Sequence, residues 1–429
     1  MRLNRGNFNL RRTRRNNMTR VALYIVVIAA GLYVINLDLE GKIEKPFLPT
    51  PTATRSPASF SEEAQAQFSA GRLNEAILAY QKATESEPTH VGYWIQLARV
   101  QVYAEQPEEG VKSASSALLI DPNNSMAHAM LALALDWSGR YEEASDAAVR
   151  AIQLDPNNAL AHAYYSEVLA DTQRWAQAGD EAKLALSLDP NSMDAYRTYG
   201  YYLESTGNYR EAIQAYQSAV KINPNLSFLY MQLGVNFRQL QEYDTAIQYF
   251  QRAQAINPND IDPYLSISRT YFQTGEYGRA AQYLEAALEI DPTNATIHGR
   301  LGLVYFKALN YESAIIELGC AVDGCTTNTD AIDADDSTPD RKIQGLELSQ
   351  STLETYYTYS SVLAALSTPE HPHCARARPL FQQILAFAPD DPIVAGIMQE
   401  NENICQIADN GGTSPEAGAT PTLAATPTP

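Results

Sequence analysis

Cysteine is absent from the first 319 residues of this 429-residue chain and occurs only four times in the remainder. This scarcity excludes a small domain held together by a dense set of disulfides. The sequence also lacks a glycine-rich phosphate loop, a Gly-x-Ser-x-Gly nucleophile elbow and a paired His-Glu zinc helix, which are motifs typical of common classes of enzyme. We therefore expect a protein that is not an enzyme and has no cofactor or metal site.

Basic residues are scarce as well, because 31 lysines and arginines stand against 50 aspartates and glutamates, a formal charge of −19. This balance argues against nucleic-acid binding through a broadly basic surface. The bases are also unevenly placed, since residues 1–37 contain seven arginines and no acid. The chain therefore consists of a short basic start and a long acidic body.

An uncharged apolar run at 21–37 separates the basic start from the acidic body. Its length predicts a transmembrane helix at the short end of the usual range of about 17–25 residues. By the positive-inside rule, the arginines before it predict a cytoplasmic stub at 1–20 and an extracytoplasmic body. A cleaved signal peptide and a buried globular helix remain alternatives, although residues 34–39 lack the small-x-small pair of a cleavage site.

The acidic body repeats itself with a period of 34 residues, which is clearest in its prolines. These are Pro88, Pro122, Pro156, Pro190, Pro224, Pro258 and Pro292. Alanine keeps the same step from Ala83 to Ala321, and a third slot holds only alanine, serine or glycine from Ala64 to Gly302. Apolar spacings of three and four predict two amphipathic helices in each unit, with the small residues where the helices approach each other.

This pattern resembles the tetratricopeptide repeat (TPR) family. The resemblance implies an all-α fold, a right-handed α-solenoid of about nine helix-turn-helix units. Units 1–8 occupy 59–325, an acidic polar insert follows at 326–350, and a degenerate ninth unit lies at 351–390. Residues 391–408 predict a capping helix, which solenoids require for solubility. Proline- and threonine-rich stretches at 38–58 and 409–429 predict a linker and a disordered tail.

All four cysteines would lie outside the membrane, where oxidising surroundings favour disulfides. Cys374 and Cys405 are at similar distances on either side of a predicted turn at 389–391, so two antiparallel helices would bring them together. Cys320 and Cys325 would close a small loop. Four cysteines allow three pairings, and the sequence leaves that choice open.

The first helix of each unit has a second face that does not pack inward, and the resemblance implies that this face lines a concave groove. Apolar side chains mixed with arginines suit a protein or peptide segment that carries acids. The predicted groove residues are Met126, Leu133, Arg197, Tyr201, Phe228, Met231, Arg238, Leu265, Arg269, Phe272, Arg300 and Phe306. For any one of them, packing between adjacent units is the alternative.

These features predict a non-catalytic scaffold that binds a protein or peptide in the TPR groove on the extracytoplasmic side of a membrane. Two alternatives stay open: an assembly factor for an envelope, pilus or secretion apparatus, and a passive surface spacer. The membrane is contacted through the N-terminal helix, no nucleic-acid partner is expected, and the oligomeric state is left open.

Overall fold

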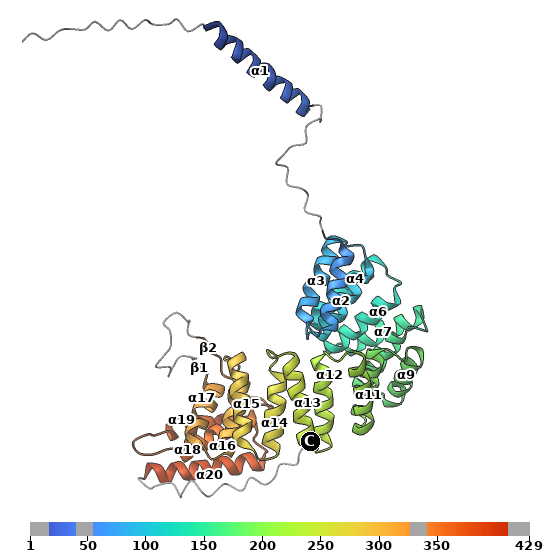
Figure 1. Ribbon diagram of the computed structural model, residues 1–429. Helices are drawn as coiled ribbons and strands as arrows, with labels where there is room; N and C mark the ends of the chain where they lie inside the picture. The colour runs from blue at the N-terminus through green and yellow to red at the C-terminus, as the bar shows by residue number, and fades with distance from the viewer. Residues whose placement is uncertain (1–16, 40–54, 327–340, 411–429) are drawn as a thin grey trace, which may run out of the picture. The chain divides into compact units, whose positions relative to one another are not determined.

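The computed structural model describes residues 17–39, 55–326 and 341–410 of the chain. The first 16 residues of the predicted stub lie outside these described residues, as do 40–54 of the linker, 327–340 of the insert and 411–429 of the tail. The contacts divide the chain into two units, residues 1–55 and residues 56–429 (Figure 1).

The first unit contains helix α1, Asn17–Leu39, which includes the apolar run. Its stretch Met18–Leu37 is long and apolar enough to cross a membrane by length and composition, and none of it is buried. At about 1.5 Å per residue, the 23-residue helix is about 34 Å long, slightly more than the ~30 Å hydrocarbon core of a bilayer. A signal sequence near an N-terminus has the same properties.

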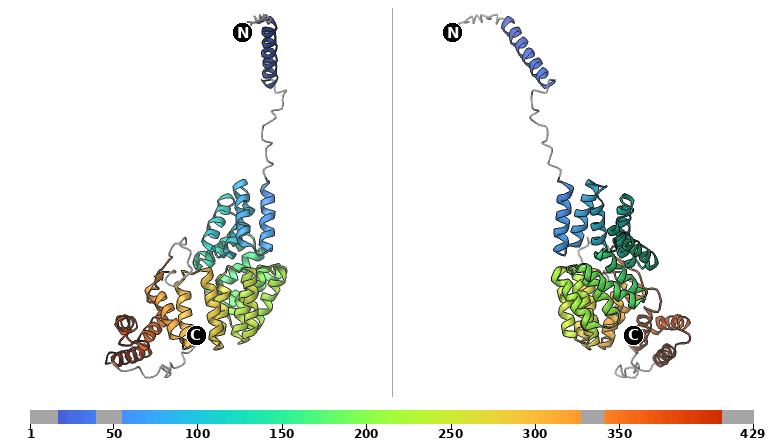
Figure 2. Two further views of the ribbon diagram at one scale, coloured as in Figure 1. Left: turned by 60° about the vertical axis from the view of Figure 1, so that its left-hand side comes forward. Right: turned by 90° about the vertical axis from the view of Figure 1, so that its right-hand side faces the viewer.

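The second unit is a series of consecutive helix pairs, numbered here 1 to 9 in chain order (Figures 1 and 2). The first helices of pairs 1 to 8 are α2 Pro57–Ser69, α4 Val91–Tyr103, α6 Ser125–Trp137, α8 Ala159–Asp171, α10 Met193–Ser205, α12 Ser227–Gln239, α14 Asp262–Gln273 and α16 Ala295–Lys307. The second helices are α3 Leu73–Ser86, α5 Pro107–Ile120, α7 Tyr141–Leu154, α9 Trp175–Leu188, α11 Tyr209–Ile222, α13 Tyr243–Ile256, α15 Tyr277–Ile290 and α17 Tyr311–Asp323. This is the α-solenoid that the 34-residue period predicts.

Small residues let the two helices of a pair approach closely. A methyl group added at Gly200 would lie 2.9 Å from the ring of Tyr216, and one added at Gly234 would lie 2.4 Å from the ring of Phe250. Both rings come from the second helix of the same pair and are fully buried. At these two positions glycine is needed because an aromatic ring fills the space where a side chain would stand.

In all eight regular pairs, the turn between the two helices has one residue in the left-handed backbone conformation at the same position. Pairs 1, 3, 5 and 7 use Gly71, Gly139, Gly207 and Gly275, and pairs 2, 4, 6 and 8 use Glu105, Gln173, Gln241 and Leu309. The residues Glu105-Gln106-Pro107 would suggest that pair 2 departs from this turn. The structure nevertheless retains it, with φ of 60° at Glu105, a conformation that costs a residue with a side chain about 1–2 kcal/mol.

The stack ends with pair 9, α18 Leu353–Ala365 and α19 Cys374–Phe387, followed by helix α20, Pro392–Asp409. Helix α20 contributes Val394 and Met398 to the same buried cluster as α18 and α19. It therefore covers the apolar end of pair 9. Before pair 9, strands β1 Cys325–Thr326 and β2 Lys342–Ile343 pair antiparallel, a short hairpin that the all-helical prediction omits.

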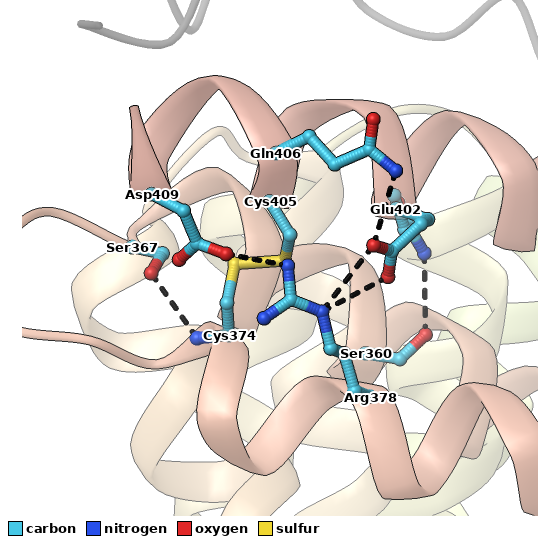
Figure 3. Close-up of a disulfide and its surroundings, with 9 residues drawn as sticks. Ser360, Ser367, Cys374, Arg378, Glu402, Cys405, Gln406 and Asp409 are labelled. Atoms are coloured by element: carbon cyan, nitrogen blue, oxygen red, sulfur yellow. Dashed lines mark hydrogen bonds and ion pairs between the residues drawn. A yellow bond between two sulfur atoms is a disulfide. The ribbon is translucent and has the colours of Figure 1, made fainter. Parts of the chain in front are cut away.

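Two disulfides stabilise this end of the molecule. Cys320 and Cys325 are bonded beside the hairpin, and Cys374 and Cys405 join α19 to α20 (Figure 3). We call the Cys374–Cys405 bond the cap disulfide. Arg378 of α19 reinforces the same junction, because its guanidinium contacts two carboxylates of α20 at 3.1 Å and 2.7 Å.

Candidate functional site

The predicted groove residues lie on first helices, and the structure divides them between two regions. In pairs 2 to 5 the first helices α4, α6, α8 and α10 contact one another directly. Side chains from these helices meet across the inner surface, and we call this part the closed region. The first helices of pairs 6 to 8, namely α12, α14 and α16, form what we call the open region.

An aspartate at the centre of the closed region joins pair 2 to pair 5. Arg99 of α4 forms an ion pair with Asp194 of α10, which is 95 residues further along the chain. Tyr103 and Tyr164 also donate hydrogen bonds to this carboxylate, the latter at 3.1 Å. Burial alone would raise the pKa of Asp194, but Arg99, Tyr103 and Arg197 outweigh it and lower the pKa. Arg99 and Asp194 therefore neutralise each other.

Arg197 of α10 is neutralised in the same way. Its guanidinium donates to both carboxylate oxygens of Glu167 on α8, at 2.7 Å and 2.5 Å, and the arginine is 4% exposed. Leu133 is fully buried, and Met126 packs against the core. The structure thus corrects the prediction that Arg197 and Leu133 present themselves to a ligand. They are internal because the inner helices of the closed region pack against one another.

Four contacts of the closed region share a spacing that the 34-residue period hides. The pairs Trp137–Glu167, Tyr164–Asp194, Glu167–Arg197 and Asp171–Tyr201 are hydrogen-bonded, and the residues of each are 30 positions apart. Thirty is one repeat less about one helical turn, so a residue meets its partner one turn earlier on the next first helix. A search for complementary side chains at this spacing identifies Arg197 as an internal partner.

Pairs 1 and 6 contact each other at the edge of the closed region. The side-chain amide of Asn225 donates to the carbonyl of Ser69 at 2.9 Å, although the two residues are 156 positions apart. Phe228 stacks on Tyr103 with 4.9 Å between ring centroids. Phe228 and Met231 also line a cavity of about 780 Å³ together with residues of pairs 1, 2, 3 and 7. These two predicted groove residues, both half-buried, therefore line a partly open cavity between distant pairs.

The open region contains three arginines on consecutive first helices: Arg238 of α12, Arg269 of α14 and Arg300 of α16. No ion pair involves any of them within the described residues, and Nη1 of Arg238 is buried without a hydrogen-bond partner there. Burial and the charge of Arg269 lower the pKa of both Arg238 and Arg300, against an opposing effect of Asp262 on Arg300. The positive charge of Arg269 therefore repels those of both Arg238 and Arg300.

We call these three residues the arginine diagonal, because their spacing places them obliquely across the stack. Successive members are 31 positions apart, three fewer than the repeat. Since consecutive first helices run in the same direction, each arginine is displaced by three residues, about 4.5 Å, toward the start of its helix. The charges thus form a line that crosses α12, α14 and α16.

Apolar side chains accompany the arginine diagonal. Leu265 and Phe272 lie one turn before and one turn after Arg269 on α14, and both are half-buried against the core. Phe306 of α16 is half-buried against the cluster that contains pair 9. The open region therefore combines unneutralised positive charge with partly exposed apolar surface.

Two histidines have acidic partners that sequence reasoning missed. Nδ1 of His162 lies 2.5 Å from Glu181, and Nδ1 of His298 lies 2.6 Å from Glu317, at the same 19-residue spacing. The hydrogen bond that His162 donates to Glu181 raises the pKa of His162, and Glu317 outweighs burial to raise the pKa of His298. These pairs link the two helices of one unit. Within the described residues, no group of three or more His, Cys, Asp or Glu side chains is arranged to hold a metal.

Family models of the tetratricopeptide repeat match five segments of the chain. They cover residues 61–90, 125–158, 193–226 and 227–260, and a further TPR model covers 269–308. The matched segments coincide with helix pairs of the solenoid. Pairs 1, 3, 5 and 6 correspond to the first four segments, and the last extends from α14 into α16.

Curated relatives match only a short part of the solenoid. The peroxisomal targeting signal receptor of Komagataella phaffii is 35% identical over 66 residues, which are 15% of this chain and 12% of the receptor. The receptor of Saccharomyces cerevisiae is 28% identical over 96 residues, 22% of this chain and 16% of the receptor. The matched part thus spans less than a fifth of the length of either relative.

Solved structures resemble the fold at low identity. The Cut9–Hcn1 hetero-tetramer of the APC/C is 17% identical with a TM-score of 0.45, covering 62% of this chain and 50% of that one. PilW, a type IV pilus biogenesis factor, is 20% identical with a TM-score of 0.42, covering 46% and 90%. Pseudomonas aeruginosa PilF is 23% identical with a TM-score of 0.40, covering 45% and 88%. These similarities concern helix packing and carry no inference about function.

Proposed function

We propose that this chain, a tetratricopeptide repeat protein by its five matched segments, is a non-catalytic scaffold that binds a carboxylate-rich segment of a partner protein along the arginine diagonal. The observation that supports this proposal is the unneutralised charge of Arg238, Arg269 and Arg300. Arg238 is half-buried, whereas Arg269 and Arg300 are exposed; for Arg238 in particular, withdrawing a charge from water without a counterion is unfavourable. Carboxylates of a ligand would relieve that cost through charge-assisted, bidentate hydrogen bonds.

The spacing of the arginine diagonal indicates the kind of segment that fits. The first helices of the open region do not pack directly on one another as those of the closed region do, so their separation is at least the roughly 8–10 Å of packed helices. With the displacement of about 4.5 Å along each helix, successive guanidinium groups are roughly 10 Å apart or more. A peptide in the polyproline II conformation advances about 3.1 Å per residue and presents every third side chain on the same face. Acidic residues at every third position would therefore meet successive arginines, while Leu265 and Phe272 offer apolar contact between them.

A direct test uses a fluorescent peptide with glutamate at every third position and the full-length chain in detergent. Replacing all three residues of the arginine diagonal by glutamine should weaken binding at least tenfold. The matched control replaces three exposed arginines of other positions, Arg174, Arg210 and Arg252, which changes the net charge equally and should leave binding nearly unchanged. Equal binding of the peptide and its glutamine counterpart would contradict the proposal.

We also propose that α1 anchors the chain in a membrane with the solenoid on the extracytoplasmic side. Three features support this: the length and apolar character of α1, the arginines that precede it, and two disulfides, which persist in oxidising compartments. In intact cells, an added protease should digest the solenoid and leave a short fragment that contains α1. Complete resistance until the membrane is permeabilised would place the solenoid on the cytoplasmic side.

A further inference from the structure

A second cavity lies within the closed region, separate from the arginine diagonal, and it differs in charge. Its volume is about 280 Å³, and its walls come from helices α6, α7, α8, α10, α11 and α12. Three carboxyl groups line it, Asp136, Glu167 and Asp171, against the single guanidinium of Arg197. The lining is therefore acidic, whereas the predicted groove was expected to be basic.

The carboxyl groups of this cavity are unequally satisfied. Glu167 is saturated, because it accepts two hydrogen bonds from Arg197 and one from the indole of Trp137 at 3.1 Å. Asp171 accepts a hydrogen bond from the hydroxyl of Tyr201 and shares another with the carboxyl group of Asp136. Asp136 is 4% exposed, and its Oδ1 has no hydrogen-bond partner within the described residues. Two acids thus face the cavity without a basic counterion.

A buried acid in this position is costly unless a proton or a cation neutralises it. Burial and the neighbouring Glu167 and Asp171 raise the pKa of Asp136 well above its ordinary value. Burial likewise raises the pKa of Asp171. The charge of Asp171 extends to the rim, since it raises the pKa of Tyr141, which is 40% exposed. Near neutral pH a proton therefore neutralises Asp136 when no ligand is bound. The negative charge of the lining comes from Glu167 and Asp171 against Arg197, and a bound cation would take the place of the proton on Asp136.

We propose that this cavity binds a primary ammonium group on an alkyl chain, with the carboxylates of Asp136 and Asp171 as its counterions. The aromatic walls formed by Trp137, Tyr141 and Tyr201 suit an organic cation, because aromatic faces attract ammonium groups and pack against methylene groups. The volume of about 280 Å³ is just below the range of about 300–1,000 Å³ typical of whole-ligand sites, so it suits one flexible chain.

This chemistry has two sources, a free aliphatic amine and a lysine side chain of a partner. They are distinguished by calorimetric titration of the full-length protein with 1,5-diaminopentane and with Nα-acetyl-lysine N-methylamide. The uncharged 1,5-pentanediol serves as the control for the alkyl chain. Saturable binding of either amine without binding of the diol supports the proposal, and the tighter amine identifies the source. Binding of neither amine to the folded protein, or equal binding of the diol, overturns it.

Two substitutions assign the binding to this cavity. Asp136→Asn and Asp171→Asn should each weaken amine binding about tenfold or more, because each removes one counterion. The matched control is Asp146→Asn on α7, an exposed aspartate outside the cavity. Circular dichroism establishes that each variant is folded, and Asp136→Asn removes a costly buried acid, so it should fold. Undiminished binding by both cavity variants would contradict the assignment. The proposal uses none of the arginine diagonal, so it is independent of the proposed peptide binding.

Discussion

Breaking the buried ion pair between Glu167 and Arg197 should strongly destabilise the middle of the solenoid. The two side chains are only 6% and 5% exposed, so Arg197→Met would leave a carboxylate buried without its counterion. Removing one partner of such a pair costs about 3–5 kcal/mol. The exposed pair of Arg140 and Glu143, with side chains 40% and 60% exposed, provides the control, and Arg140→Met should cost at most about 1 kcal/mol.

The double variant Arg197→Met with Glu167→Gln separates the charge from the packing. The glutamine can still accept the hydrogen bond of Trp137 but leaves no buried charge, so most of the lost stability should return. Stability in repeat proteins is local, so the assay is native-state hydrogen exchange in α8 and α10. About 3–5 kcal/mol corresponds to roughly hundred- to several-thousand-fold faster exchange. A loss below about 1 kcal/mol in the single variant, or no recovery in the double variant, would refute this reasoning.

Raising the pH from about 6 to 8 should destabilise pair 4, because the pKa of His162 is raised in the folded chain. The stability that protonated His162 contributes is complete below the pKa of the unfolded chain, about 6.5. It is lost as the pH rises through the pKa of the folded chain. In thermal melts, His162→Gln should remove the part of this dependence that comes from pair 4 and leave the part that comes from His298 in pair 8. His128→Gln should leave it unchanged, since alanine stands 19 residues after His128. Gly234→Ala should lower the free energy of unfolding by about 1–3 kcal/mol through its clash with Phe250. Gly278→Ala, where the added methyl group has no atom within 4 Å, should be neutral or stabilising by up to about 1 kcal/mol. Equal urea midpoints for these two variants would contradict this prediction. Reducing the cap disulfide, whose cysteines are 31 residues apart, should speed exchange in α20 by an amount equivalent to about 3–4 kcal/mol and leave α2 unchanged; unaltered exchange in α20 would show that the bond is dispensable.

The repeat period predicts the helix pairs well because it records the packing inside one pair. Gly234 and Phe250 belong to the same 34-residue unit. Their positions therefore recur at the repeat period and can be recognised in the sequence. The turns are less visible, because four of the eight left-handed positions lack the glycine that would mark them, as Leu309 shows.

The groove could be predicted only in part, because the period fixes the slot of a residue and leaves open how closely successive pairs approach. Leu133 and Val235 occupy equivalent slots three repeats apart. Leu133 is fully buried where α4, α6, α8 and α10 pack together, whereas Val235 of the open region is half-buried. Arg197 forms a buried ion pair with Glu167 for the same reason, because the first helices pack together there. The sequence does not reveal the acidic cavity, because its three carboxyl groups occupy three different slots of the repeat, one in pair 3 and two in pair 4.

The most direct test of the proposed scaffold is photocrosslinking from the open region of the full-length chain in the cells that produce it. A photoreactive amino acid at Phe272, beside the arginine diagonal, should crosslink a partner through an acidic segment. Replacement of the arginine diagonal by glutamine should abolish that product. The control position is Leu119 of α5, which is 86% exposed on a second helix. Crosslinking that is stronger from Leu119, or that persists from Phe272 without the three arginines, would contradict binding along the diagonal.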